Sequence, residues 1–297
     1  MIQNFDELLS KRDRARGKII AVAASNHLHT LKAVFDAEEE FGINYLLVGD
    51  RMKTLEICEN MGKSISDEKI IPADTEEEAA SKAVALVKEK RADLLMKGNI
   101  QTAVLLKAVL NKEKGISTGG VMCHMAVIET RGYEKLLFMS DGGMIPYPTL
   151  DQKRAIIEEG VKFMHSLGYS EPKVAILSAV ETVNEKMPET LEAKELTRLN
   201  KEGIIKGCIV EGPLSMDLAI SPESAAIKGI KSRIGSKADF LVMPNISAGN
   251  IMSKALTFLG GAKMAGCILG AEVPIVLSSR GASEEEKRLS MLLCLSL

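Results

Sequence analysis

Short apolar runs alternate along this chain with longer amphipathic segments. The runs have the length and β-branched content of strands, and they cover residues 18–24, 45–49, 93–96, 121–129, 135–139, 173–178, 207–211, 239–243, 264–269 and 274–278. Several show little polar alternation, as in the IIAVA run of 19–23, which is typical of parallel strands covered on both faces. Their alternation with helical segments predicts βαβ units and a three-layer α/β fold.

The starts of several helices are also recognisable. Thr75 with Glu78, and Thr149 with Gln152, have the spacing of capping boxes, and Pro222 stands where the first residue of a helix is expected. The runs 121–129 and 135–139 follow each other too closely for a helix between them, so we expect a hairpin there.

Composition narrows the class of protein. The chain has 297 residues, 46% of them hydrophobic and 26% charged, which are ordinary values for a soluble globular protein. A net charge of −2 argues against a dedicated nucleic-acid binder. No apolar run approaches the ~18 residues that span a membrane, and the charged N-terminus does not resemble a signal peptide. Five widely spaced cysteines are interpreted as reduced thiols, so we expect a cytoplasmic protein.

Two strand-to-helix junctions near the C-terminus carry the candidate chemistry. The run 240–243 leads into Pro244 to Asn250, and the run 274–277 leads into Ser278 to Gly281. Such junctions expose backbone N–H groups and the positive end of a helix dipole, which favour an anion. Arg280 adds a forked donor for phosphate or carboxylate. Together they suggest an enzyme for a phosphorylated substrate.

Other common motifs are missing or incomplete. No G-x-G-x-x-G follows the first strand, so the dinucleotide fingerprint is absent. His27 and His29 are two residues apart, which does not place them on one helical face, and we predict no metal site.

The C-terminal half resembles a known family through a series of ordered blocks. These blocks are VEGPLSMDLAIS at 210–221, AAIKGI at 225–230, ADFLVMPN at 238–245, AGNI at 248–251, LGA at 269–271, PIV at 274–276 and SRG at 279–281. They resemble the phosphate acetyl/butyryltransferase family, and more its butyryltransferase branch. YLLVGD at 45–50 and LLMKG at 94–98 extend the resemblance more weakly into the first half.

The resemblance implies two α/β/α domains with a cleft between them, akin to isocitrate and isopropylmalate dehydrogenase. Residues 1–140 and 266–297 would form a discontinuous domain carrying the Ser-Arg motif. Residues 141–265 would form an inserted domain carrying the Pro-Asn and Gly-Asn motifs. The family also implies a homodimer or larger homo-oligomer.

The family reaction converts acyl-CoA and phosphate into acyl phosphate and CoA, with CoA as a substrate and without metal or redox cofactor. Carried onto this chain, it makes Arg280 the phosphoryl ligand, Ser279 a donor to the carbonyl oxygen, and Glu286 the base that accepts the thiol proton. Related acetyltransferases carry Asp where this chain has Glu286.

Further substrate-binding candidates are Gly249 and Asn250, with Asn245 before them. Lys97 and Gly98 stand at another strand end.

A structural interpretation stands beside each of these roles. Ser283 and Glu286 also have the spacing of a capping box, and the two roles of Glu286 are not exclusive. Arg280 could pair with that acidic turn, and Gly249 and Asn250 could shape a helix start.

We expect a phosphate acyltransferase that acts on butyryl-CoA or a similar short-chain acyl-CoA by direct thiol attack in a ternary complex. The alternatives are phosphate acetyltransferase, a metal-dependent hydroxyacid dehydrogenase of the same fold, and a non-catalytic protein that binds CoA or acyl phosphate.

Overall fold

The computed structural model describes residues 1–277 and 281–297, which form two compact units. Unit 1 comprises Met1–Phe5 and Val121–Met264, and unit 2 comprises Asp6–Gly120 and Ala265–Leu297. The chain therefore changes units at Val121, whereas the sequence suggested Asp141. The reason is strand pairing, because the 121–140 segment forms a hairpin whose second strand pairs with a strand of unit 1.

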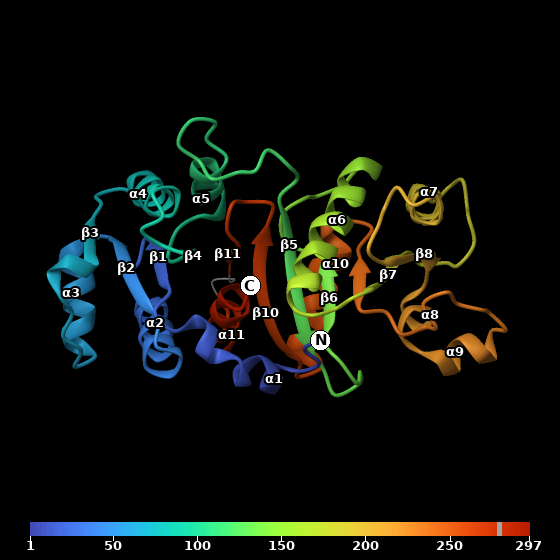
Figure 1. Cartoon of the computed structure of the whole chain (residues 1–297), viewed down its shortest axis with the longest axis horizontal. Coiled ribbons are helices and arrows are strands. Elements are labelled where there is room, and N and C mark those ends of the chain that lie inside the picture. The colour runs from blue at the N-terminus through green and yellow to red at the C-terminus, as the bar shows by residue number, and fades with distance from the viewer. Residues whose placement is uncertain (278–280) are drawn as a thin grey trace. The chain divides into compact units, whose positions relative to one another are not determined.

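Unit 2 is built on a sheet with the strand order β3-β2-β1-β4-β11-β10 (Figure 1). The strands are β1 (Ile19–Ala23), β2 (Asn44–Gly49), β3 (Ile70–Pro72), β4 (Leu94–Lys97), β10 (Lys263–Leu269) and β11 (Ile275–Val276). β11 is antiparallel to β10, and the pairs from β3 to β11 are parallel. The central strands β1 and β4 are almost fully buried, which explains their unbroken apolar sequences.

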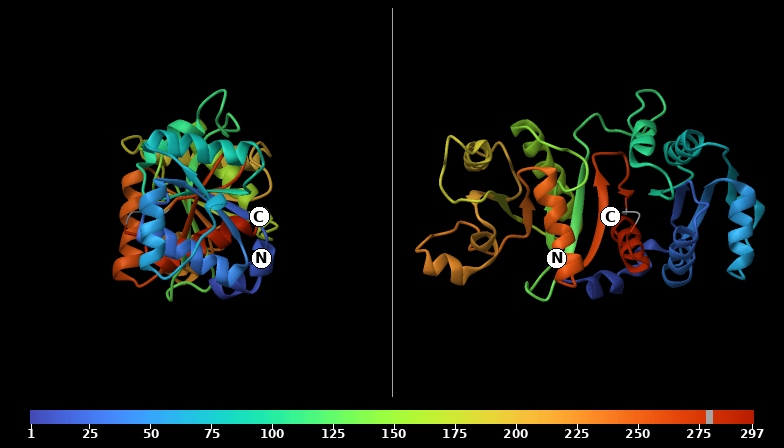
Figure 2. Two further views of the ribbon diagram at one scale, coloured as in Figure 1. Left: turned by 90° about the vertical axis from the view of Figure 1, so that its left-hand side faces the viewer. Right: turned by 180° about the vertical axis from the view of Figure 1, so that it is seen from behind.

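Helices cover both faces of this sheet. α4 (Glu76–Lys88) and α5 (Thr102–Val109) lie on one face, and α2 (Leu28–Phe41), α3 (Arg51–Asn60) and α11 (Glu284–Leu295) lie on the other (Figures 1 and 2). α1 (Phe5–Ser10) and two short 3₁₀ turns, Arg12–Ala15 and Asp67–Lys69, complete the unit. The result is the expected three-layer arrangement.

Unit 1 has the strand order β5-β6-β9-β7-β8. β5 (Cys123–Glu129) and β6 (Leu137–Ser140) form the predicted antiparallel hairpin. β6, β9 (Phe240–Val242), β7 (Lys173–Leu177) and β8 (Ile209–Leu214) are parallel neighbours. The first residues of the chain join this unit, since Tyr169 donates its hydroxyl to the Ile2 carbonyl at 2.6 Å.

The two faces of the unit 1 sheet are also covered. α6 (Leu150–Ser166) lies on one face and α10 (Ile246–Lys254) on the opposite face (Figures 1 and 2). α7 (Pro188–Lys201) packs on α6 and β8, whereas α8 (Met216–Ile220), α9 (Pro222–Ile227) and α10 share one hydrophobic core. A π-helical turn, Ala255–Leu259, continues α10.

The predicted helix starts are confirmed, with one difference in detail. Thr149 and Gln152 form a complete capping box at the start of α6, and Pro222 begins α9. Thr75 caps α4 by accepting the N–H of Glu78 at 3.1 Å. The Glu78 carboxylate, however, accepts the N–H of Asp74 at 2.8 Å, so the box closes one residue earlier than expected.

Every predicted strand is present, but β3 was missed. β3 has three residues, ends in a proline and lies at the edge of its sheet. A run of three residues is too short to show a hydrophobic periodicity. Proline at an edge is tolerated because its missing N–H would face solvent.

Gly160 of α6 tests the packing of α6 on the sheet. A Cβ built at Gly160 would lie 2.5 Å from Cε1 of Phe240, a ring on β9 with no exposed surface. Glycine to alanine in a helix normally stabilises by about 0.5–1 kcal/mol. We expect Gly160→Ala to reverse that sign and cost about 1–3 kcal/mol, because the core cannot accept the methyl group without moving the ring.

The measurement is the unfolding free energy from urea titration. Gly132→Ala is the matched control, because a Cβ at Gly132 would meet nothing within 4 Å. A variant at Gly160 as stable as the control would contradict the close approach of α6 and β9.

Candidate functional site

The parallel strands of unit 2 end at one edge of its sheet, and the strand order reverses there. From β1 the chain moves outward to β2 and β3, and it then returns to β4 on the other side of β1. Ligands of open α/β sheets bind in the crevice outside the carboxyl ends of strands at such a reversal. Ala23 at the end of β1 pairs with Lys97 at the end of β4, so Lys97 lies at this point.

The side chain of Lys97 is buried although it carries a charge. Its relative exposure is 6%, and Nζ lies 3.4 Å from the carbonyl oxygen of Gly98. Burial of an ammonium is costly unless partners compensate it. The lysine therefore occupies a defined position, unlike a solvated surface residue.

Gly98 is required by the close approach of two backbone segments. A Cβ there would lie 2.3 Å from the Ala24 carbonyl oxygen and 2.5 Å from that of Ala23. The backbone amides of Gly98 and Asn99 donate to these carbonyls, each at 2.9 Å. The chain after β4 thus stays paired with the chain after β1, and the glycine is explained by this packing.

The Ser-Arg motif follows β11. β11 runs parallel to β4, with Val276 opposite Met96, so its chain leaves the sheet at the same edge as Lys97. Ser279 and Arg280 themselves lie outside the described residues.

Glu286 is the third residue of α11, as expected. Its backbone N–H donates to Oγ of Ser283 at 3.1 Å, so Ser283 caps the helix. The side chain of Glu286 is half-buried. This bond uses the backbone of Glu286, so it explains Ser283 and leaves the role of the Glu286 carboxylate open.

In unit 1, Asn245 caps α10. Its Oδ1 accepts the N–H of Ala248 at 3.0 Å, and the next amide, of Ile246, donates to the Pro146 carbonyl at 3.0 Å. Two of the N–H groups at this helix start are therefore already satisfied within the protein.

Gly249 and Asn250 hold a turn that follows β6. A Cβ at Gly249 would lie 2.6 Å from the Asp141 carbonyl oxygen, so only glycine allows this contact. The side-chain amide of Asn250 donates to the Gly142 carbonyl at 3.2 Å. Both residues thus have an architectural role near the start of α10.

Asp141 organises the same turn and was left without a role by the sequence. It is 1% exposed, and its Oδ1 accepts the N–H groups of Gly143 at 2.7 Å and Met144 at 2.8 Å. Its Oδ2 accepts the N–H of His124 at 3.1 Å. An aspartate directly after a strand and before Gly-Gly could have indicated such a turn.

His124 lies opposite Asp141 on the neighbouring strand β5. Its ring packs against Gly143, whose Cβ would lie 3.0 Å from Cγ of His124. Burial lowers the pKa of His124, and the Asp141 carboxylate partly opposes that shift. In the described part of the chain its Nδ1 is buried without a hydrogen-bond partner.

The predicted site residues therefore form two groups. Lys97, Gly98 and Glu286 belong to unit 2, and Asn245, Gly249 and Asn250 belong to unit 1. For Gly98, Asn245 and Gly249 the structure supplies a conformational reason that the sequence could not separate from ligand binding.

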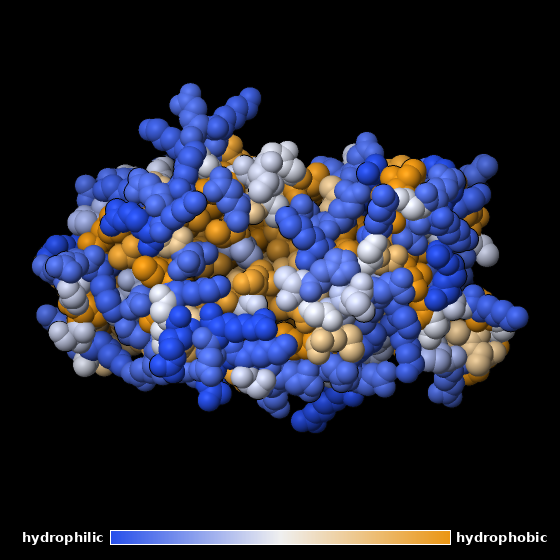
Figure 3. Space-filling view, in the orientation of Figure 1, coloured by the Kyte–Doolittle hydropathy of each residue, from blue (hydrophilic) through white to orange (hydrophobic). Residues whose placement is uncertain are grey.

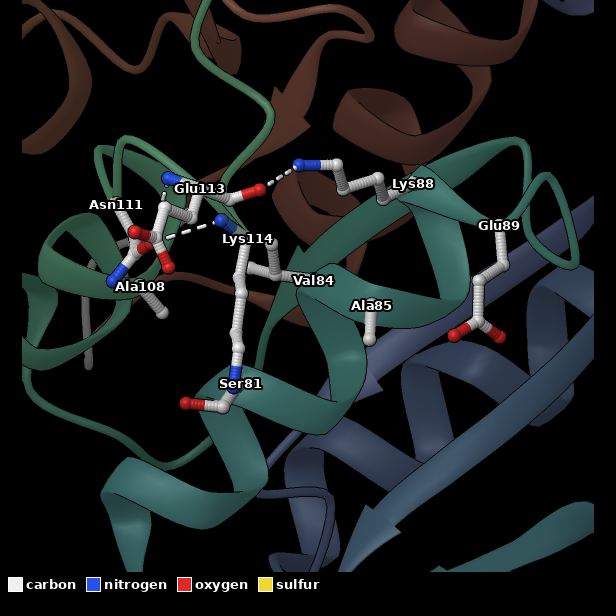
Figure 4. Close-up of a pocket in the computed structure, with 9 residues that line it drawn as sticks. All are labelled: Ser81, Val84, Ala85, Lys88, Glu89, Ala108, Asn111, Glu113 and Lys114. Carbon is white, nitrogen blue, oxygen red and sulfur yellow. Dashed lines mark hydrogen bonds between the residues drawn. The ribbon is translucent and has the colours of Figure 1, made fainter.

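A separate cavity of about 350 Å³ in unit 2 contains none of these residues (Figure 4). Ser81, Val84 and Lys88 of α4 form one wall, and the loop after α5 forms the other. Lys88 donates to the Glu113 carbonyl, and this exposed loop projects as a hydrophilic protrusion at the top of Figure 3. The C-terminal ends of α4 and α5 border the cavity, so it lies toward the amino ends of the parallel strands, away from Lys97.

Within residues 1–277 and 281–297, every helix is too short or too polar to span a membrane. The same ranges hold no group of three or more His, Cys, Asp or Glu side chains placed to bind a metal ion.

Comparison with known proteins supplies the identity of the family. Residues 72–294 match the profile of the family described as phosphate acetyl/butaryl transferase. The chain is 41% identical over 293 residues to the phosphate butyryltransferase of Clostridium acetobutylicum, covering 99% of this chain and 97% of that protein. It is 43% identical over 289 residues to the phosphate acetyltransferase of Thermotoga maritima, covering 97% of this chain and 98% of that protein.

Solved structures agree with these matches. A branched-chain phosphotransacylase from Enterococcus faecalis V583 superimposes with a TM-score of 0.82 at 33% identity, covering 94% of this chain and 98% of that one. A 4-hydroxythreonine-4-phosphate dehydrogenase from Klebsiella pneumoniae shares the fold, with a TM-score of 0.56 at 12% identity over 95% of this chain and all of that one (100%). The predicted α/β fold of the isocitrate dehydrogenase type is thereby confirmed. The chain belongs to the phosphate acetyl/butyryl transferase family of acyltransferase enzymes.

Proposed function

We propose that this enzyme interconverts butyryl-CoA and phosphate with butyryl phosphate and CoA. The observation that carries the proposal is the full-length match to the phosphate butyryltransferase of Clostridium acetobutylicum. The 33% identity to a phosphotransacylase described as branched-chain also favours an acyl group larger than acetyl. The placement of a buried lysine at the switch point of unit 2 suits a phosphorylated substrate.

The chemistry requires a proton acceptor and a stabilised oxyanion. In the direction of acyl-CoA synthesis, the CoA thiol loses its proton and its sulfur attacks the acyl carbon. A C–S bond forms, the C–O bond to phosphate breaks, and inorganic phosphate leaves. The thiolate is the nucleophile and a free thiol has a pKa of about 8.5, so a base that takes the proton in the transition state raises the rate.

We assign the roles as the family resemblance implies them. Glu286 accepts the thiol proton, Arg280 binds the phosphoryl group, and Ser279 donates to the carbonyl oxygen as charge develops on it. Lys97 adds positive charge for the phosphorylated substrate. Gly98 lets the chain after β4 approach the chain after β1 closely.

In unit 1, Asn245, Gly249 and Asn250 act by fixing the start of α10 and the turn at Gly142. No covalent acyl-enzyme is required, because the two substrates react directly in a ternary complex. The homodimer or larger homo-oligomer expected of the family stays a prediction.

Phosphate acetyltransferase is the second candidate. The 43% identity to the Thermotoga maritima enzyme favours it. The two activities differ by two methylene groups on the acyl chain, so the shape of the acyl pocket decides between them.

The first prediction concerns the substrate. Purified enzyme should release CoA from acetyl-, propionyl- and butyryl-CoA when phosphate is present, with kcat/KM highest for butyryl-CoA. Each methylene in a fitted pocket is worth about tenfold or more. The measurement is thiol release with and without phosphate. The highest kcat/KM with acetyl-CoA would establish the second candidate, and release that does not depend on phosphate would contradict both.

The second prediction separates the two roles of Glu286. Gln still fits the third position of a capped helix, so Glu286→Gln should change stability by only a few tenths of a kcal/mol. As general base its loss should lower kcat by roughly 10²–10⁴-fold. Melting temperature and kcat are measured beside Glu285→Gln, the neighbouring control in the same turn. Near-normal turnover would leave Glu286 a residue of the helix start.

The third prediction concerns Arg280. Arg280→Lys keeps the charge but loses the planar fork that binds two phosphoryl oxygens. We therefore expect KM for phosphate to rise more than KM for acyl-CoA, in initial-rate measurements with each substrate varied. An equal rise in both constants would argue against a phosphoryl ligand.

A further inference from the structure

Lys287 is a buried cation to which neither the sequence nor the family resemblance gives a role. It is the fourth residue of α11, next to Glu286, and it is 6% exposed. A buried ammonium costs several kcal/mol of desolvation unless counter-charges and hydrogen bonds offset it. We therefore expect counter-charges and hydrogen-bond acceptors around the ammonium of Lys287.

Those surroundings compensate it incompletely. The ammonium has three donors, and Nζ donates to the Ala282 carbonyl at 2.7 Å. No ion pair joins Nζ to a carboxylate in the described part of the chain. Glu286 and Glu284 act on it from a greater distance, and burial outweighs them, so the pKa of Lys287 lies below its usual value.

Lys153 of unit 1 is a buried lysine that has a counter-ion. It is 2% exposed, and its Nζ forms an ion pair with Glu192 of α7. Lys287 is buried to a similar degree, but among residues 1–277 and 281–297 no carboxylate forms an ion pair with it.

The ammonium of Lys287 points toward the start of its own helix. Ala282, its hydrogen-bond partner, precedes the capping residue Ser283, so the side chain turns back past the first turn of α11. The first turn of α11 lies against the first turns of α2, because Glu284 pairs there with Lys32 and His29. His27 stands between β1 and α2, at the carboxyl edge of the unit 2 sheet.

The start of α2 also favours negative charge. His27 occupies the capping position but makes no side-chain capping hydrogen bond within the described residues. The positive end of the α2 dipole and the Lys287 ammonium therefore act on the same region. The nearby carboxylate of Glu284 is taken up by Lys32 at 2.6 Å and His29 at 3.6 Å.

We infer that Lys287 binds a phosphate group of a substrate and that this anion is the missing counter-ion of its buried ammonium. The inference rests on the proposed function and adds a phosphate ligand to it. Inorganic phosphate, the phosphoryl group of an acyl phosphate and the phosphates of CoA share this chemistry. The experiment distinguishes these sources by presenting inorganic phosphate and CoA separately.

Lys287→Met is the test, because methionine keeps the length of the side chain and removes its charge. Loss of a charge-assisted hydrogen bond should raise KM for the substrate whose phosphate Lys287 binds, either inorganic phosphate or acyl-CoA, by about 10- to 100-fold. The change in kcat should be smaller. The melting temperature without ligand should stay the same or rise, because an uncompensated buried charge is gone. The increase in melting temperature that inorganic phosphate or CoA causes in the wild-type protein should disappear for the one that Lys287 binds.

Two control variants make the result specific. Lys153→Met removes a buried lysine that has a counter-ion, so it should lower the melting temperature. The KM for phosphate and the KM for acyl-CoA should stay unchanged. Lys82→Met removes an exposed amine paired with Glu78 on α4 and should change neither property. Lys287→Gln is the second variant, should the methionine protein fail to fold.

The probes are inorganic phosphate alone, CoA alone and 3′-dephospho-CoA alone, each in a thermal-shift titration of wild type and variant. Loss of the phosphate response with the CoA response kept identifies the site of the transferred phosphoryl group. Loss of the CoA response identifies a CoA phosphate, and it is the 3′-phosphate if both proteins respond equally to dephospho-CoA. Either result supports the inference.

Two results would overturn it. A Lys287 variant that melts several degrees lower but keeps every ligand response would make the lysine structural. Wild-type protein that responds to none of the probes would contradict the proposed function as well, whereas normal wild-type binding with an unaltered variant contradicts this inference alone.

Discussion

Parallel strand pairing is the constraint on which the rest of unit 2 depends. Because β1, β2, β4 and β11 run in the same direction, the segments that follow them emerge at one edge of the sheet. The return of the chain to β4 beside β1 separates the helices that start there onto opposite faces. Lys97, the start of α2 and the end of β11 therefore lie at one edge although they are far apart in the sequence.

Close backbone packing fixes these segments in place. Gly98 allows the chain after β4 to pair with the chain after β1, and Gly249 allows α10 to touch the turn at Gly142. A methyl group at either position would meet a carbonyl oxygen at 2.3 Å or 2.6 Å. Glycines that looked like phosphate contacts in the sequence therefore act first on backbone geometry, and any anion would bind to a framework already set by them.

Two buried lysines give positive charge to the carboxyl edge of the unit 2 sheet. Lys97 and Lys287 are both 6% exposed, and each belongs to a segment at the carboxyl edge of the same sheet. Holding an ammonium out of water reduces stability, so its presence suggests a function that offsets the cost when ligand is bound.

The sequence predicts most of the fold and less of the site. Apolar runs such as 19–23 are unambiguous because both faces of the strand are covered, whereas the three-residue β3 was too short to read. The sequence suggested a change of domain at residue 141, whereas the compact units change at Val121, because the partner of β6 is β9, about a hundred residues later.

The roles of the site residues were also harder to predict, because they depend on contacts that are distant in the sequence. The role of Asp141 depends on backbone amides that fold back onto its carboxylate, and the isolation of Lys287 depends on burial. Neither property is local in sequence.

Binding of phosphate at the carboxyl edge of the unit 2 sheet can be measured by hydrogen–deuterium exchange with and without inorganic phosphate. We expect slower exchange in segments 24–31, 97–102 and 281–288, with no change around 108–114 beside the cavity at the opposite end of the strands. Protection confined to 108–114, or none in the three segments at saturating phosphate, would contradict it.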